Sequence, residues 1–212
     1  MPIKTSRLNL AKLLDLALCL AFAASLFAGA ASAADLSNIA EIRKAAQQGD
    51  AKAQYALGQY FLEASHADRQ RVAQDEAEAV KWTRKAAEQG LAQAQYHLGA
   101  MYDKGQGVAQ DHAEAARWYR KAAEQGHPQA QFELGQMYRA SRGVARDDAQ
   151  AIQWTRKAAQ QGVAQAQYSL GVLYVLGVSV TQNDAEAIKW FRKAAEQGNE
   201  EARKALEKMS PH

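Results

Sequence analysis

Apolar residues recur along this chain at the spacing of one face of a helix. Between Ala92 and Lys104 they stand at positions i, i+4, i+7 and i+8, as Ala94, Leu98, Met101 and Tyr102. A second set between His112 and Gln125 has the same helical spacing: Ala115, Trp118, Tyr119, Ala122 and Ala123. The residues between the two segments contain glycines that permit a turn, and Asp111 can cap the second helix. The pattern therefore predicts two amphipathic helices joined by a turn.

This pair of helices recurs along the chain. A segment of the second helix returns almost unchanged, as KWTRKAAEQG from Lys81, RWYRKAAEQG from Arg117, QWTRKAAQQG from Gln153 and KWFRKAAEQG from Lys189. Its tryptophans lie 36 residues apart and are the only ones in the chain: Trp82, Trp118, Trp154 and Trp190. Such a period is typical of a solenoid, in which each stacked unit buries one face against the next.

Aligned on that segment, the chain divides into four units with a half-unit at each end. The units are residues 50–90, 91–126, 127–162 and 163–198, and the first contains a five-residue insertion within LEASHADRQRVAQD. We expect the insertion to lengthen the turn and the first helix. Residues 34–49 and 199–212 are each typical of one helix with polar residues where the units have aromatic residues or glycine, which suits the exposed ends of a solenoid. We therefore predict an all-α fold of ten helices: a cap, four pairs and a cap with a short tail.

A glycine interrupts the first helix of every unit, although glycine costs about 1 kcal/mol there relative to alanine. The four are Gly58, Gly99, Gly135 and Gly171. A cost that recurs four times requires a packing reason. We expect the missing Cβ to let the second helix approach, with the tryptophan of that helix filling the space beside the glycine.

The unit AQAQYHLGAMYDKGQGVAQDHAEAARWYRKAAEQG resembles the Sel1-like repeat, a relative of the tetratricopeptide repeat. The resemblance rests on Ala-x-x-x-Leu-Gly-x-x-Tyr, a Gly-x-Gly-Val turn and Ala-x-x-Trp-x-x-x-Ala-Ala-x-x-Gly, and it covers residues 50–198. It implies a right-handed α-α superhelix that acts as an adaptor or scaffold for other proteins. A cysteine-rich secreted branch of the family is associated with penicillin binding and β-lactamase activity. The alternative function is therefore a cell-wall-directed enzyme, active on β-lactams or peptidoglycan.

The first 33 residues have the three-part layout of a secretory signal peptide. Basic residues precede an apolar run that begins at Leu13, and small residues follow it up to Ala33. We predict cleavage after Ala33 and a periplasmic or secreted protein without a stable membrane anchor. A retained anchor is the alternative, against which Asp15 stands inside the apolar run. Cleavage removes Cys19, the only cysteine, so we expect no disulfide in the mature protein and no β-lactamase activity of the cysteine-rich kind.

Charge and chemistry point away from a nucleic-acid or catalytic site. The formal net charge of +3 falls to about +1 once the signal peptide is removed, which gives no reason to expect nucleic-acid binding. The histidines His66, His97, His112 and His127 occupy different positions of their units without zinc-ligand spacing, and we interpret them as solvated. Arginine-lysine pairs recur after each tryptophan, and we interpret them as a solvated basic face; the alternative is a site for an anionic polymer. We predict no metal, no cofactor and no catalytic residue.

The candidate binding surface is a second stripe of the first helices, turned away from the buried stripe. It comprises Tyr55, Gln59, Leu62, Tyr96, Ala100, Asp103, Phe132, Gln136, Arg139, Tyr168, Val172 and Val175. Each unit contributes three of these residues, and the first is always aromatic while the other two vary. Such variation is expected of residues that contact a partner, whereas residues that pack one unit on the next should repeat. By analogy with tetratricopeptide arrays, we expect a protein or peptide partner to bind there, on the concave face of a monomer or weak oligomer. The alternative is that the aromatic residues pack between units.

Two expectations about this stripe depend on how its side chains are held. We expect removal of Tyr96 and Asp103 together to spare the fold and weaken a partner. Unit 4 adds an apolar cluster, GVLYVLGVSV. In it we expect Val175 to contact the partner and Val178 to be covered by the C-terminal helix.

Overall fold

The computed structural model describes residues 33–67, 72–178 and 180–209, and these ranges form ten α-helices and no strand. The first five are α2 (Ala33–Gln47), α3 (Ala51–Ala67), α4 (Val72–Glu88), α5 (Ala92–Lys104) and α6 (His112–Glu124). The others are α7 (Pro128–Ala140), α8 (Asp148–Gln160), α9 (Ala164–Leu176), α10 (Asp184–Glu196) and α11 (Glu200–Met209). The predicted signal peptide lies outside the described residues, except for its last position.

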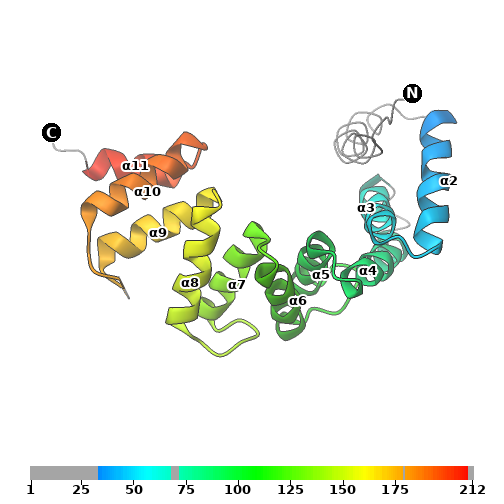
Figure 1. The fold of residues 1–212 in the computed structure, drawn as a ribbon, viewed down its shortest axis with the longest axis horizontal. Coiled ribbons are helices and arrows are strands. Elements are labelled where there is room, and N and C mark those ends of the chain that lie inside the picture. The colour runs from blue at the N-terminus through cyan, green and yellow to red at the C-terminus, as the bar shows by residue number, and fades with distance from the viewer. Residues whose placement is uncertain (1–32, 68–71, 179, 210–212) are drawn as a thin grey trace, which may run out of the picture.

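Each helix packs on the helices that precede and follow it in the chain, and the ten together form an open arc (Figure 1). At the bottom and right of the arc, α3 and α5 lie on the inner side of α4 and α6 (Figure 1). This is the expected order of a cap, four pairs and a cap. The all-α solenoid is therefore confirmed.

The five-residue insertion of the first unit extends its helices. Both α3 and α4 contain 17 residues, whereas α5 and α6 contain 13 each. The longer first helix is confirmed, but the second helix is lengthened as well, which we did not expect. The prediction of a longer turn is wrong, because α4 begins at Val72, only five residues after α3 ends at Ala67.

The packing beside the helical glycines differs from our expectation. A methyl group on Gly99 would lie 2.8 Å from Cδ1 of Tyr119, and one on Gly171 would lie 2.6 Å from Cδ1 of Phe191. In the other two units the nearest side-chain atom is a threonine hydroxyl, on Thr83 beside Gly58 and on Thr155 beside Gly135. The residue that follows the tryptophan therefore occupies the space at each glycine. The prediction that the tryptophan fills it is wrong.

Each tryptophan packs instead toward the preceding unit. Trp118 is 6% exposed and lies in a cluster with Val80 of α4 and Leu98 of α5. Trp154 is half-buried against the cluster that contains Leu134, and Trp190 is half-buried against the cluster that contains Leu170. The tryptophans thus join neighbouring units, as expected of an inter-unit joint, although the glycines do not receive them.

The recurring basic residues contact this joint. The ammonium of the lysine three positions after each tryptophan lies over the indole, 4.0–4.5 Å from the ring centroid, at Lys85, Lys121, Lys157 and Lys193. Arg120 donates to the hydroxyl of Tyr138 at 2.6 Å, and Arg84 bonds Tyr102 in the same way. Cations over aromatic faces are stabilising. The residues of the basic face therefore also stabilise the fold.

A ladder of glutamines provides a further joint that the sequence analysis missed. Buried Gln95 donates through Nε2 to the carbonyl oxygen of Ala87 at 3.1 Å, and its Oε1 accepts from Nε2 of Gln125 at 2.7 Å. The other units repeat both bonds with Gln54 and Gln89, Gln131 and Gln161, and Gln167 and Gln197. Through these two hydrogen bonds, the buried glutamine links the end of one unit to both helices of the next unit. Its recurrence between an alanine and an aromatic residue in every unit was a signal that could have been used.

Candidate functional site

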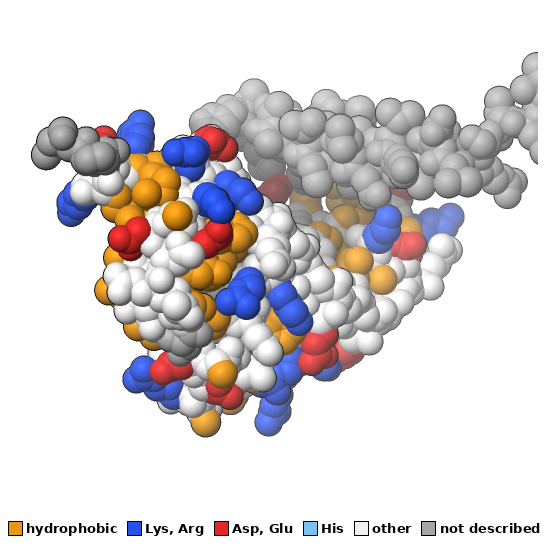
Figure 2. Space-filling view, turned by 60° about the vertical axis from the view of Figure 1, so that its left-hand side comes forward, with side chains coloured by type: hydrophobic (Ala, Val, Ile, Leu, Met, Phe, Trp, Pro, Cys, Tyr) orange, Lys and Arg blue, Asp and Glu red, His pale blue; other side chains and the backbone are white. Residues whose placement is uncertain are grey.

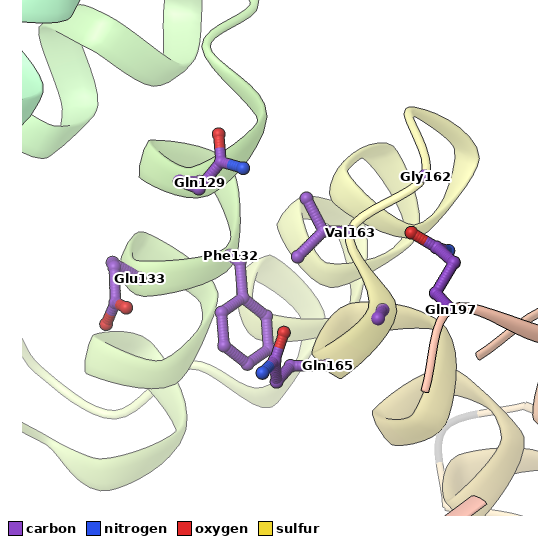
Figure 3. A pocket seen from close by; sticks show the side chains of 8 residues that line it. Gln129, Phe132, Glu133, Gly162, Val163, Gln165 and Gln197 are labelled. Carbon is purple, nitrogen blue, oxygen red and sulfur yellow. The ribbon is translucent and has the colours of Figure 1, made fainter. Parts of the chain in front are cut away.

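The first-helix face, which we define as the surface formed by α3, α5, α7 and α9, contains a groove. This α7–α9 groove lies between α7 and α9 over α8 and has a volume of about 590 Å³. Five of the twelve predicted partner residues line it: Phe132, Gln136, Arg139, Tyr168 and Val172. A pocket of about 450 Å³ adjoins it at the N-terminal ends of α7 and α9, and Phe132 and Gln165 border both. Figure 3 shows the Phe132 ring beside Gln165 at this boundary.

Two small side chains account for the groove. Thr155 of α8 forms part of the floor and Ser169 of α9 part of the wall. In the preceding unit the position of Thr155 is taken by Tyr119, whose ring lies 5.8 Å from that of Tyr96. The larger side chain fills the corresponding space. The alternation of threonine and aromatic residues after the tryptophans could have located the groove, but the sequence analysis did not use it.

The groove also contains apolar residues that were not among the twelve. Ile152 of α8 and Leu173 of α9 line it, and so do Leu176 and Val178. Leu176 is 64% exposed and Val178 45%. These two are the exposed large apolar residues of the described chain. Figure 2 shows hydrophobic side chains interspersed with lysine and arginine on the face formed by the C-terminal units.

One of the two expectations for the apolar cluster of unit 4 is contradicted. The exposure of Val178 shows that the C-terminal helix does not cover it, so that prediction is wrong. Val175 is half-buried against the cluster that contains Ala202 of α11, which Leu206 also contacts. Val175 and Leu206 thus share one apolar cluster, and a contact of Val175 with a partner stays a prediction.

Between α5 and α7 the first-helix face is occupied by stacked rings. The ring of Tyr96 lies 4.6 Å from that of His127 at an interplanar angle of 18°, and 5.2 Å from that of His97. The backbone N–H of Ala130 donates to Nδ1 of His127, so His127 Nε2 carries the proton and donates to Oε1 of Gln93 at 2.9 Å. Nε2 of Gln93 in turn donates to Nε2 of His97 at 3.0 Å.

These histidines are not the solvated residues that we expected. Burial, followed by the charges of His127 and Lys104, lowers the pKa of His97 from 6.5 to about 4. Burial also lowers the pKa of His127. His97 is additionally 5.4 Å from the ring of Tyr55, so it bridges α3 and α5. Position 66 lies among the residues whose side chains the structure does not describe.

Asp103 and Tyr96 hold neighbouring units together. A carboxylate oxygen of Asp103 lies 2.8 Å from Nδ1 of His112, and the other lies 3.3 Å from the guanidinium of Arg142 in the next unit. Tyr96 is held by the rings described above. We therefore no longer expect their joint removal to spare the fold. The alternative interpretation of the aromatic position, packing between units, holds for Tyr96.

The remaining candidates are also partly engaged in packing. Tyr55 and Leu62 pack, half-buried, against the cluster around Leu98, and Ala100 packs against the one around Leu134. Gln59 is half-buried on the same helix as Tyr55. The structure thus gathers one group of candidates into a groove, whereas the N-terminal ones take part in packing between helices.

Within the described ranges, no group of three or more histidine, cysteine or acidic residues has a geometry that could hold a metal ion. In the same part of the chain, no helix is both long and apolar enough to cross a membrane. One carboxyl stands out in the smaller pocket, where burial raises the pKa of Glu133.

The family model of the Sel1 repeat matches residues 51–91, 92–127, 128–163 and 164–199. Among solved structures, the chain is similar to a Sel1 repeat protein from Oxalobacter formigenes, with 35% identity and a TM-score of 0.66 over 76% of this chain and 63% of that one. It is also similar to c5321, a protective antigen of uropathogenic Escherichia coli with an SLR fold. There the identity is 35% and the TM-score 0.61, over 81% of this chain and 43% of that one.

A third similar structure is that of the immunity protein PA5088 from Pseudomonas aeruginosa, with 26% identity and a TM-score of 0.54 over 95% of this chain and 69% of that one. The comparison with curated proteins found no match. This chain spans less than two thirds of the length of the first two structures.

Proposed function

Because the chain belongs to the Sel1 repeat family, we propose that it is an exported, non-catalytic scaffold that binds a protein or peptide on the concave face formed by α3, α5, α7 and α9. Sel1 repeat proteins are generally protein-interaction scaffolds. The binding face, the export and the absence of catalysis are our proposals for this chain. One similar structure is of an immunity protein and another of a protective antigen.

The observation that carries the proposal is the α7–α9 groove. Its apolar lining includes Leu176 and Val178, whose exposure leaves apolar surface in contact with water. Concave sites with apolar walls and a few polar groups are the usual form of a binding site, and exposed apolar patches mark interfaces. The candidate residues of units 1 and 2 are engaged in packing, so we place the main contact in units 3 and 4.

Rigidity is the physical basis of the proposed mechanism. The glutamine ladder, the tryptophan joints and the contacts of Asp103 fix the angle between neighbouring units. A surface held in its binding shape loses little conformational entropy when a partner docks. Recognition therefore requires no bond to be made or broken.

A cell-wall-directed enzyme is the function that we set aside. A hydroxyl nucleophile needs a base within hydrogen-bond reach. The groove contains the hydroxyls of Thr155 and Ser169, but none of the described histidines lines it. Its one carboxylate, on Asp148, is held by Arg146 at 3.0 Å. This arrangement favours binding over hydrolysis.

Photo-crosslinking in the intact cell envelope tests the scaffold. A photoreactive amino acid at Gln136, in the groove, should yield a discrete adduct with another protein. The same residue at Gln153, exposed on α8 and outside the groove, is the matched control and should not. Adducts from neither position, or equally from both, would contradict a partner on this face. Cell fractionation with N-terminal sequencing tests export, which predicts a chain that begins at Ala34 outside the cytoplasm.

A further inference from the structure

The two ends of the α7–α9 groove differ in chemistry. At the N-terminal ends of α7 and α9, its border is formed by the amides of Gln129, Gln165 and Gln197 and by the carboxyl group of Glu133 (Figure 3). At the C-terminal ends it is formed by two guanidinium groups, on Arg139 and Arg146, beside the exposed side chains of Leu176 and Val178. A ligand that fills the groove therefore meets amides and one carboxyl group at one end and guanidinium groups at the other.

The cationic end has more positive than negative charge. Arg146 binds Asp148 through two hydrogen bonds of 3.0 Å. Arg139 is exposed, and none of the ion pairs formed among the described residues includes it. In the preceding unit the same position holds Asp103, which is paired with Arg142. One guanidinium at this end is thus available to a carboxylate of a partner, and guanidinium groups bind carboxylates in a well-defined geometry.

The middle of the groove suits aliphatic side chains. Ile152, Leu173 and Val172 line it, and the small Thr155 and Ser169 leave depth between them. Burial of an aliphatic side chain in such a depression removes apolar surface from water and so stabilises a complex. A purely ionic ligand would leave these walls exposed to water.

The length of the groove is that of a short extended peptide. Helices α7 and α9 contain 13 residues each, which corresponds to about 20 Å. An extended chain of about six residues spans the same distance. The amides at the far end can donate to and accept from its backbone.

We propose that the α7–α9 groove binds an extended segment of a partner protein in which aliphatic side chains enter the depression above Thr155 and an aspartate or glutamate pairs with Arg139. This inference rests on the proposed scaffold function and names the chemistry of the partner. The charge at position 139 then determines which segments bind, while the apolar walls provide most of the affinity.

A peptide selection tests the inference. The whole chain, a charge-reversed variant Arg139→Glu and a control variant Arg156→Glu are each used to select from a phage library of random dodecapeptides. Arg156 is an exposed arginine of α8 outside the groove, so the control carries the same change of charge. We expect the unaltered chain and the control to enrich aliphatic sequences with an acidic residue. Arg139→Glu should enrich lysine or arginine at that position.

Synthetic versions of the enriched peptides provide the quantitative measurement. By fluorescence anisotropy, the acidic peptide should bind Arg139→Glu about tenfold more weakly than the unaltered chain, and its charge-swapped version should regain the loss. Ser169→Trp should fill the groove and abolish binding of both peptides. Circular dichroism melts confirm that each variant is folded.

The possible failures are distinguishable. Peptides without an acidic preference, or peptides that bind Arg139→Glu and Ser169→Trp as well as the unaltered chain, overturn the inference and leave the scaffold standing. Absence of any enriched peptide also overturns it. The scaffold itself fails if crosslinking in the envelope yields no adduct from the first-helix face, or yields adducts equally from the control position Gln153.

Discussion

Thr155 lies directly against Gly135. A methyl group on that glycine would stand 2.9 Å from Oγ1 of Thr155 and 3.0 Å from the carbonyl oxygen of Ala151. The helices α7 and α8 therefore approach each other to backbone contact. In unit 2, by contrast, the atoms nearest to the corresponding glycine belong to the ring of Tyr119. The close approach of α7 and α8 in unit 3 therefore leaves the groove deep.

Substitution of this glycine by alanine tests how closely α7 and α8 approach, because the approach decides whether the substitution stabilises or destabilises the protein. By helix propensity alone, Gly135→Ala should stabilise the protein by about 1 kcal/mol. Because the added methyl meets a backbone carbonyl that cannot move independently, we expect instead a loss of about 2 kcal/mol in the free energy of unfolding. Urea denaturation measures it. Thr155→Ala added to Gly135→Ala should recover only part of the loss, and unchanged or higher stability of the single variant would show that the helices are farther apart.

The tryptophans should contribute according to their burial. Trp118 is 6% exposed, so Trp118→Ala should lower the free energy of unfolding by about 3–5 kcal/mol. Trp154 is only half-buried, and Trp154→Ala should cost about 2 kcal/mol. The two variants are compared in the same denaturant titration. An equal or reversed order would contradict the packing described for the inter-unit joint.

Removal of one buried amide from the glutamine ladder should lower the stability of the protein. Gln131 donates to Ala123 and accepts from Gln161 at the joint between units 2 and 3. Gln131→Leu leaves these partners without their bonds, and we expect a loss of about 2 kcal/mol. Gln153→Leu makes the same chemical change at an exposed position and should alter stability by less than about 0.5 kcal/mol. Thermal melts of both variants check this, and equal melting temperatures would mean that the ladder does not stabilise the stack.

The turn of unit 3 offers a stabilising substitution. Ser141 has a φ of 54° at the end of α7, where units 2 and 4 have Gly105 at 70° and Gly177 at 64°. A residue with a Cβ is strained in this left-handed conformation by about 1 kcal/mol. Ser141→Gly should therefore raise the melting temperature. Ser141→Ala keeps the Cβ and should not, and a gain from alanine as large as that from glycine would assign the effect to the hydroxyl.

The buried imidazole of His97 predicts a dependence of stability on pH. Its pKa falls from 6.5 in the unfolded chain to about 4 in the folded protein, chiefly because of burial. Between these values the unfolded chain binds a proton that the folded protein does not, so acid favours unfolding. Stability from this group is complete above about pH 6.5 and declines as the pH falls toward 4, by up to about 3 kcal/mol.

Urea titrations at about pH 7 and about pH 4.5 measure this decline. The variant His97→Gln lacks the titrating group and should lose less stability between the two conditions. If the variant and the unaltered chain decline in parallel, the acid sensitivity belongs to other groups.

The architecture was predictable because its cause is repeated and local. Helical spacing, capping residues such as Asp111 and a period of 36 residues specify a stack of helix pairs whatever their exact contacts. The candidate site was predicted only in part. The period placed Phe132, Arg139 and Tyr168 on one stripe, but it treats all units alike and so did not separate the open groove from the filled surface near Tyr96.

By itself, the sequence determined the helices, their order, their turns and the family, because each of these depends on residues within one unit or on the same contact made again. The tertiary structure alone decided which side chain lies beside each glycine, which ring stacks on which histidine, and where a groove remains. Those outcomes depend on the volumes of residues that meet across units, such as Thr155 and Ser169, and their fit is set only when the helices have packed.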